Sequence, residues 1–239
     1  MLKKIFFKFL IILRKVFIWF VVLSIATTII YRWINPPITP LMIWRVCEQL
    51  FDSDKEVKLT KDWVPLSEIS PQMPLAVVAA EDQKFSEHIG FDIDAMEKAL
   101  QYNQTHKGKV RGASTISQQV AKNVFLFPDR TYLRKALEVY FTFLIEIIWS
   151  KERILEVYLN VIEMGEGIYG TEAAAQHYYK KKAAQLSKYE CAAIASILPN
   201  PRVWSPLKPN ARVARKIKRV MVYMKYIDLK DVLADDDKK

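Results

Sequence analysis

The chain has 239 residues, of which 51% are hydrophobic and 26% are charged. This composition excludes a wholly disordered protein, and the length allows one medium domain with an accessory segment but not two full enzyme domains. The formal net charge is +10, so the segments that carry the excess positive charge are the first guide to partners.

Two segments carry most of that excess. Residues 1–35 contain six basic residues and no acidic residue, and residues 105–135 contain seven basic residues and one acidic residue. Each segment therefore has a charge of +6, and subtraction from +10 leaves −2 for the rest of the chain. We expect two local anionic partners, one for each basic segment.

The first basic segment contains an apolar run at residues 16–34, in which Arg32 is the only charged residue. The run approaches the roughly 20 residues that span a bilayer, and basic residues at its ends can snorkel to the interfaces. We predict a basic cytoplasmic tail at residues 1–15, a retained transmembrane anchor at residues 16–34, and a chain that continues outside the cytoplasm. A cleaved signal peptide and a buried core helix are alternatives, but the run is long for a signal core and no A-x-A site follows it.

After the anchor, residues 35–70 are assigned to a linker and lead-in segment, because the chain is first rich in proline and then shows no clear period. From residue 71 apolar residues recur every three or four positions, which predicts a mainly α domain over residues 71–227 and a charged tail over residues 228–239. Helices are expected at residues 74–86, 92–104, 115–123, 131–149, 151–163, 170–181, 186–197 and 210–226. No alternating β-branched run is long enough to predict a strand.

Cysteine and histidine contribute little to the predicted chemistry. Cys47 and Cys191 could pair in an exported compartment, but Cys191 lies in an apolar run and is predicted to be a small core residue. The three histidines are separated along the chain, so no metal site is predicted.

A first polar cluster contains Glu81 and Asp82. An apolar stretch leads into Glu81, so this carboxylate is expected at the edge of the polar surface, where it can act as a general base. The alternative for a single glutamate is an ordinary surface salt bridge.

A second polar cluster surrounds a predicted helix start. Ser114 and Thr115 precede a helix that carries Gln118 and Gln119, with Lys122 one turn after Gln118. A helix N-terminus with hydroxyls and a nearby lysine is typical of a site that binds phosphate.

A third cluster combines cations with one acid. Arg130, Arg134 and Glu138 are spaced by four and share one helix face, next to Lys135. They form either a surface ion-pair ladder or a clamp for a diphosphate in which Glu138 holds the cations in order. The surplus of cations favours the clamp.

Five sequence motifs occur in order over residues 71–206, and together they are highly specific although each alone is weak. They are E-D-x-x-F-x-x-H-x-G at residues 81–90, G-x-S-T-I-x-Q-Q at 112–119, R-K-x-x-E at 134–138, K-x-x-I-L-E-x-Y-L-N at 151–160, and Glu190 followed by L-P-N-P at 198–201. This combination resembles the peptidoglycan glycosyltransferases of bacterial cell-wall synthesis, whose domain is shared with class A penicillin-binding proteins.

The resemblance implies a mainly α fold with a lysozyme-like helical head and a small membrane-associated jaw, preceded here by one N-terminal transmembrane helix. It also implies the substrate lipid II, a disaccharide-pentapeptide on an undecaprenyl diphosphate. The implied reaction joins lipid II into linear β-1,4 glycan strands and releases undecaprenyl diphosphate with inversion at the anomeric carbon.

The resemblance also assigns roles at the matching positions. Glu81 matches the catalytic base that takes a proton from the acceptor 4-hydroxyl, and Glu138 matches a second essential carboxylate on the donor side. The basic positions that steady diphosphates are Lys122, Arg130, Arg134 and Lys135. The polar wall of the cleft consists of Ser114, Thr115, Gln118 and Gln119. Asp82 is counted with the substrate-binding residues and is expected to orient Glu81 or its neighbours, and Phe85 is expected in the core.

Further expectations follow from the resemblance. The chain ends about thirty residues after its last motif, so we expect glycan polymerisation without transpeptidase activity. No cofactor is required, although Mg²⁺ or Mn²⁺ could screen the diphosphate. The expected partners are lipid II, the growing glycan strand, the lipid bilayer and proteins of cell division or elongation, with no nucleic acid.

The expected location is the bacterial inner membrane, with a single pass and an extracytoplasmic catalytic domain. The apolar run at residues 124–128 fits a jaw that dips into lipid, with core packing as the alternative.

Two other functions would share part of this pattern. A glycan-cleaving enzyme of the lysozyme type would share the fold and an essential glutamate, but it would not need cations for a diphosphate. A catalytically silent membrane scaffold would not need Glu81 and Glu138 intact.

Overall fold

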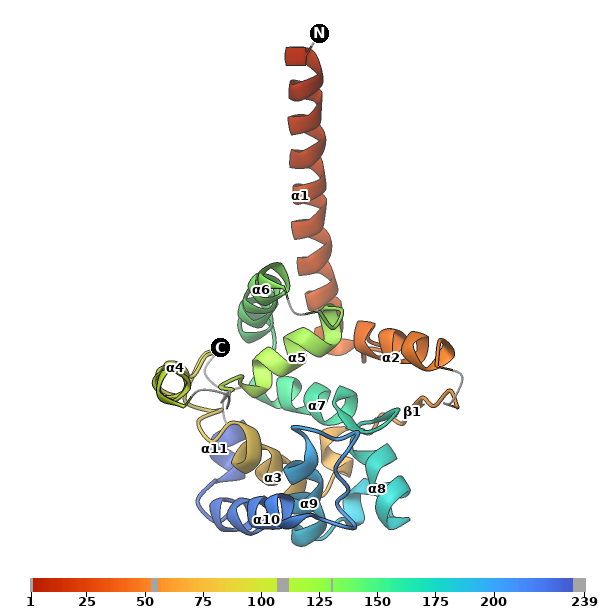
Figure 1. The fold of residues 1–239 in the computed structure, drawn as a ribbon, viewed down its shortest axis with the longest axis vertical. Helices are drawn as coiled ribbons and strands as arrows, with labels where there is room; N and C mark the ends of the chain where they lie inside the picture. The colour runs from red at the N-terminus through yellow and green to blue at the C-terminus, as the bar shows by residue number, and fades with distance from the viewer. Residues whose placement is uncertain (1, 53–55, 107–111, 130, 234–239) are drawn as a thin grey trace. The chain divides into compact units, whose positions relative to one another are not determined.

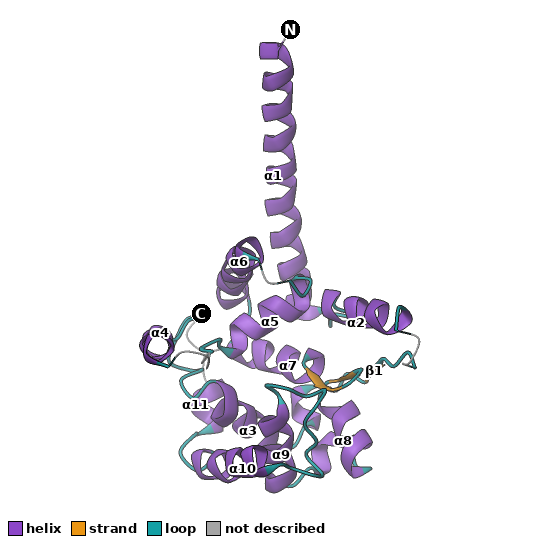
Figure 2. Cartoon of the chain, in the orientation of Figure 1, coloured by secondary structure: helices purple, strands orange, loops and turns teal. Residues whose placement is uncertain are grey.

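The structure is a computed structural model that describes residues 2–52, 56–106, 112–129 and 131–233. The chain divides into two compact units, Met1–Asn35 and Pro36–Lys239, which are described separately. Helices dominate the described residues, with only short strands (Figure 2).

The first unit is a single helix, α1 (Leu2–Trp33). It begins fourteen residues before the predicted anchor at residues 16–34, so the basic segment at 2–15 is also helical. Lysine and arginine are good helix formers, and apolar residues separate them here, so the charges do not interrupt the helix. The span Lys3–Trp33 is long and apolar enough to cross a membrane, and its most apolar window is only 6% buried. A signal sequence near an N-terminus would pass the same test of length and composition.

All eight predicted helices are present in the second unit. They are α3 (Gln72–Glu81), α4 (Ile93–Thr105), α5 (Ile116–Phe125), α6 (Tyr132–Ile148), α7 (Lys151–Val161), α8 (Thr171–Tyr179), α9 (Lys188–Ile197) and α10 (Ala211–Tyr223). The largest difference is that α3 ends at Glu81 rather than residue 86. Asp82 leaves the helical conformation, and the chain then turns repeatedly up to Gly90.

The structure adds elements that the sequence did not predict. The longest is α2 (Pro40–Leu50), which lies in the segment expected to be a linker. Thr39 caps this helix by accepting a hydrogen bond from the Met42 N–H at 3.3 Å, and Pro40 is its first residue. Proline is favoured at the first helical position, so a proline-rich stretch can start a helix as well as form a linker. The shorter additions are α11 (Leu229–Leu233) and the 3₁₀ turns η1 (Leu66–Glu68) and η2 (Ala183–Gln185).

A small sheet joins β1 (Thr60–Lys61), β2 (Glu163–Gly165) and β3 (Ile168–Tyr169) in the order β1-β3-β2. β1 is parallel to β3, and β2 is antiparallel to it. Strands of two or three residues are too short to show alternation, which is why no strand was predicted. Gly167 has a φ of +67°, and a Cβ atom there would lie 2.2 Å from the carbonyl oxygen of Lys58, so the turn requires glycine.

Two groups of packed helices form the interior and position the site. α3 packs on α9 and α10, whereas α5 packs on α6 and α7 (Figure 1). The cysteines are both free: Cys47 is exposed, and Cys191 is buried in α9 as predicted. Burial raises the pKa of the Cys191 thiol to about 12, so this residue serves as an unreactive core side chain.

Candidate active site

Glu81 is the last residue of α3, where the buried apolar helix meets polar surface. Its Oε1 atom accepts a hydrogen bond from Nζ of Lys216 at 2.9 Å, and its Oε2 atom accepts one from Nε2 of Gln119 at 3.3 Å. Its side chain is 14% exposed. The two donors come from α10 and α5, so the packing of both helices fixes the direction of the carboxylate.

A further hydrogen bond fixes the orientation of the Gln119 side-chain amide. The hydroxyl of Tyr158, on α7, donates to Oε1 of Gln119 at 3.4 Å, which leaves the amide nitrogen to face Glu81. Burial raises the pKa of Tyr158 well above its ordinary value, so this hydroxyl keeps its proton.

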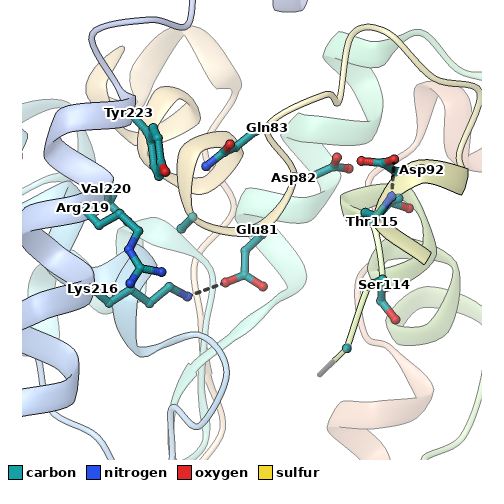
Figure 3. A pocket seen from close by; sticks show the side chains of 14 residues that line it. Glu81, Asp82, Gln83, Asp92, Ser114, Thr115, Lys216, Arg219, Val220 and Tyr223 are labelled. Carbon is teal, nitrogen blue, oxygen red and sulfur yellow. Dashed lines mark hydrogen bonds and ion pairs between the residues drawn. The ribbon is translucent and has the colours of Figure 1, made fainter. Parts of the chain in front are cut away.

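A polar pocket of about 430 Å³, here named the Glu81 pocket, opens beside this carboxylate. Figure 3 shows Lys216, Arg219 and Tyr223 of α10 on one side, and Ser114 and Thr115 on the other. The pocket presents cations, hydroxyls and carboxylates, which suits a ligand with several hydroxyl groups.

Asp82 fastens α3 to the start of α5. Its Oδ2 atom accepts the Ile116 N–H at 3.0 Å, and its Oδ1 atom lies 2.9 Å from Nε2 of His88. Thr115 and Gln118 close a capping box at the same helix start. The N–H groups of Ile116 and Gln118 are thus already hydrogen-bonded within the protein, which leaves fewer donors at this helix N-terminus for the predicted phosphate site. Gln118 is buried in the cap and does not line the Glu81 pocket.

A buried ion pair between Lys151 and Glu146 holds the loop that follows Glu81. Nζ of Lys151 donates to Oε1 of Glu146 at 2.9 Å and to the carbonyl oxygen of His88 at 2.6 Å. Ser117 also donates to Glu146, and Lys151 lies 4.6 Å from the centre of the Phe85 ring. Phe85 is fully buried, as predicted. The network therefore ties the loop after Glu81 to α5, α6 and α7.

A second pocket of about 650 Å³, here named the Lys122 pocket, is lined by Gln119, the residue that donates to Glu81. It is lined from α2, α5, α6 and the segments after α7 and α9, and it includes Gln119, Lys122 and Arg134. Within the described part of the chain, the side chain of Lys122 makes no hydrogen bond or ion pair. Burial lowers its pKa, as do Arg134 and Lys135, and Glu138 and Glu81 partly oppose the shift.

The predicted cluster on α6 is an ion-paired group. Glu138 is buried, and it accepts from Nη1 of Arg134 at 2.7 Å and from Nζ of Lys135 at 2.5 Å. Arg134 also lines the Lys122 pocket, whereas Lys135 and Glu138 do not. Arg130 lies outside the described residues.

Unsatisfied polar atoms gather in the Lys122 pocket. The buried side-chain atoms without a hydrogen-bond partner among the described residues include four from this pocket's lining: Arg45 Nε, Asn123 Nδ2, Arg134 Nε and Glu163 Oε1. Each such atom costs about 1–3 kcal/mol when nothing satisfies it. Burial also raises the pKa of Glu163, partly offset by Arg45 and Arg202. These four atoms are buried, and Arg45 Nε lies 3.5 Å from Oε2 of Glu163 in an ion pair. The polar groups around the pocket are therefore incompletely hydrogen-bonded within the described residues.

Comparisons with known proteins identify the family of this chain. The sequence matches the family described as Transglycosylase over residues 48–225. The chain belongs to this transglycosylase family. Among similar curated proteins, three are described as a biosynthetic peptidoglycan transglycosylase.

The relative from Pseudomonas syringae pv. syringae is 50% identical over 202 residues, which cover 84% of this chain and 85% of that protein. The relative from Bdellovibrio bacteriovorus is 51% identical over 207 residues, covering 87% and 82% respectively. The relative from Bacteroides thetaiotaomicron is 49% identical over 214 residues, covering 90% and 86%. The family resemblance of the five motifs is confirmed.

Several pocket residues of this family member were missed by the sequence prediction. Asn123 could have been found, because it lies four residues after Gln119 and so shares its helix face. Arg45 and Glu163 gave no signal, because α2 and the small sheet were not predicted.

Lys216 and Arg219 were missed because the charge count hid a third basic segment. Residues 202–227 carry eight basic residues and no acidic residue. When this +8 is subtracted from the −2 of the remainder, the other residues carry −10. The small net charge of the remainder therefore hid one strongly basic segment among acidic ones. Counting charge in short windows would have identified the segment that contains α10.

The exposed apolar surface of the second unit differs from the predicted jaw run at residues 124–128. Val124 and Leu126 are buried, and Phe127 is the exposed large apolar side chain of that run. α6 exposes Leu133, Val139, Phe143 and Ile147 to solvent. Several exposed large apolar side chains on one helix are typical of contact with lipid or a partner.

Proposed function

We propose that this protein polymerises lipid II into linear β-1,4 glycan strands and releases undecaprenyl diphosphate with inversion at the anomeric carbon. Membership of the transglycosylase family supports glycan strand polymerisation. The observation that carries the proposal is the position of Glu81 between two polar pockets. Glu81 lines one pocket, and Gln119, which donates to Glu81, lines the other.

This arrangement fits a single displacement between two bound sugars. The acceptor binds in the Glu81 pocket, and Glu81 takes the proton of its 4-hydroxyl as that oxygen attacks the donor anomeric carbon. The donor binds in the Lys122 pocket, and its bond to the diphosphate oxygen breaks with the electron pair leaving on the diphosphate. Lys216 and Gln119 hold both carboxylate oxygens in place, so the base needs little reorientation.

The leaving diphosphate requires positive charge. Lys122 lies in the donor pocket without an ionic partner among the described residues, so its ammonium is available to the substrate. Arg134 lines the same pocket and is held in place by Glu138. Such fixed cations stabilise charge that develops as the bond breaks. The family motif adds Arg130 and Lys135 to this group, and Glu138 holds Arg134 and Lys135 in order.

The proposal also includes attachment of the protein to a membrane. The apolar helix α1 supports anchoring, and the exposed apolar face of α6 supports contact with lipid. We infer a single pass through the bacterial inner membrane, with the N-terminus in the cytoplasm and the catalytic unit outside. We also infer contacts with cell-division or elongation proteins, and we assign no step to a cofactor.

The test uses the full chain in detergent with labelled lipid II, followed by gel separation of glycan strands. Wild type should form polymer, and Glu81→Gln should form none while keeping its melting temperature. Glu87→Gln is the matched control, because Glu87 belongs to the same motif but is exposed and does not line either pocket. This variant should polymerise at the wild-type rate.

Three outcomes would contradict parts of the proposal. Polymer from Glu81→Gln at the wild-type rate would remove Glu81 as the base. Shortening of preformed glycan by the wild type would favour a lysozyme-type hydrolase. Binding of lipid II without polymer by the wild type would favour a scaffold.

A further inference from the structure

The helix α10 has one strongly basic face. It carries Arg212, Arg215, Lys216, Lys218 and Arg219 and no acidic residue. Four of these cations, all except Lys218, recur at spacings of three and four and so form a stripe along the helix. The neighbouring face, with Val213, Ile217 and Val220, is buried against α9 and α3.

This basic stripe lines a groove of about 500 Å³, here named the α10 groove. The residues that line the groove include Arg212, Arg215, Lys216, Arg219 and Trp204, and none of them is acidic. The guanidinium of Arg212 lies over the Trp204 ring, 5.4 Å from its centre. Lys216 and Arg219 line both this groove and the Glu81 pocket, so the two spaces adjoin.

Most cations of the stripe have no acidic partner among the described residues. Of the four, Lys216 pairs with Glu81, and in the part of the chain that the structure describes the other three have no ion pair. Arg212 with Lys216 and Arg215 with Arg219 are like-charge pairs at i, i+4, which destabilise a helix. An anion bound in the groove would remove this repulsion at a point adjacent to the catalytic carboxylate.

The position of the groove indicates which anion it takes. Within the unit Pro36–Lys239, α10 and the apolar helix α6 lie at opposite ends (Figure 1). A diphosphate on a lipid tail must stay near the apolar end, because the tail cannot leave the bilayer. The peptide branch of the same substrate has no such tether, and a peptide attached by its N-terminus ends in a carboxylate.

We propose that the α10 groove binds a peptide carboxylate of the acceptor while its 4-hydroxyl is held at Glu81. This inference rests on the proposed function and adds a peptide-recognition site to it. Arg212 and Arg215 are the residues that test it, because they line the groove but not the Glu81 pocket.

The experiment compares two substrates, lipid II and lipid II whose peptide carboxylates have been converted to amides. With lipid II, Arg215→Gln should raise KM about two- to fivefold, and Arg212→Gln combined with Arg215→Gln about tenfold, at unchanged kcat. With the amide substrate, the wild type should show the raised KM and the variants no further change. Lys218→Gln is the matched control, because it removes the same charge from the same helix outside the groove, and it should leave KM unchanged.

Several results would overturn the inference. An equal rise in KM for both substrates would assign the anion to the diphosphate. An equal effect of Lys218→Gln would show that net charge, rather than the groove, matters. No effect of the double variant would show that the groove is unused.

A binding measurement separates this inference from the proposed function. The dissociation constants of both substrates are measured on Glu81→Gln, with and without the Arg212→Gln and Arg215→Gln changes. The difference between substrates should persist there, because binding does not require the base. Equal dissociation constants would refute peptide recognition, whereas failed polymerisation by the wild type would refute the proposed function alone.

Discussion

The ion pair between Lys151 and Glu146 allows a direct test of what holds the active site in place. Both side chains are almost fully buried, at 4% and 3% exposed, and Nζ lies 2.9 Å from Oε1. Lys151→Met keeps most of the side-chain volume but removes the amine. Glu146 then loses its cation while its side chain is only 3% exposed, and the carbonyl of His88 loses a donor.

The expected effect is large. Removing one partner of a buried ion pair costs about 3–5 kcal/mol. In a unit of this size, each kcal/mol lowers the melting temperature by about 2–4 °C, so we expect a fall of about 6–20 °C. Activity should fall as well, because the loop after Glu81 is held by the same ammonium. Thermal unfolding followed by circular dichroism in detergent measures the fall.

The matched control is Lys84→Met. Lys84 and Asp94 approach to 2.7 Å, a closer contact than the buried pair, but their side chains are 44% and 65% exposed. Exposed pairs contribute little, so this variant should barely change the melting temperature. Replacing both buried partners, Lys151→Met with Glu146→Leu, should recover part of the lost stability, because no uncompensated charge remains. The reasoning is refuted if Lys151→Met lowers the melting temperature no more than Lys84→Met does.

Two further predictions concern the Lys122 pocket. Burial lowers the pKa of Lys122, so kcat/KM should decline at a lower pH than for an exposed lysine, and Lys122→Arg should move that decline to higher pH in a pH-rate profile. Because the folded protein binds this proton less tightly than the unfolded chain, the free energy of unfolding should rise as pH increases from the folded to the ordinary pKa. Asn123→Leu removes a buried unsatisfied donor, so urea unfolding should show a gain of about 1 kcal/mol while kcat/KM falls about five- to tenfold. A loss of both stability and activity in Asn123→Leu would show that this amide supports the fold.

The sequence predicts the helices of the second unit well, because most of them bury several apolar residues, although α4 buries only Ala99. It fails where that signal is absent. α2 begins in a proline-rich stretch, and its register is set by packing on α5. The strands have two or three residues and exist because Gly167 permits a tight approach to Lys58, which a local pattern cannot reveal.

The candidate site likewise contains residues that the sequence predicts and residues that it does not. Glu81, Gln119 and Lys122 lie in motifs whose residue types already indicate acid–base and anion chemistry. Their partners come from distant segments: Lys216 is 135 residues from Glu81 in sequence, and the two meet because α10 and α3 pack together. Residues that act through such tertiary contacts carry no local spacing signal, although the charge of their own segment remains readable.

The first motif shows why a motif alone does not separate chemistry from support. Glu81 and Asp82 both line the Glu81 pocket, but Asp82 also holds the start of α5, and Phe85 lies in the core. Gly90 has a φ of +77°, and a Cβ atom there would approach Cγ2 of Thr142 to 2.7 Å, so this glycine allows the loop to close on α6. This motif thus combines the proposed base with residues that hold the surrounding loop in place. Substitution of these holding residues should lower stability and activity together, whereas substitution of Glu81 should lower activity alone.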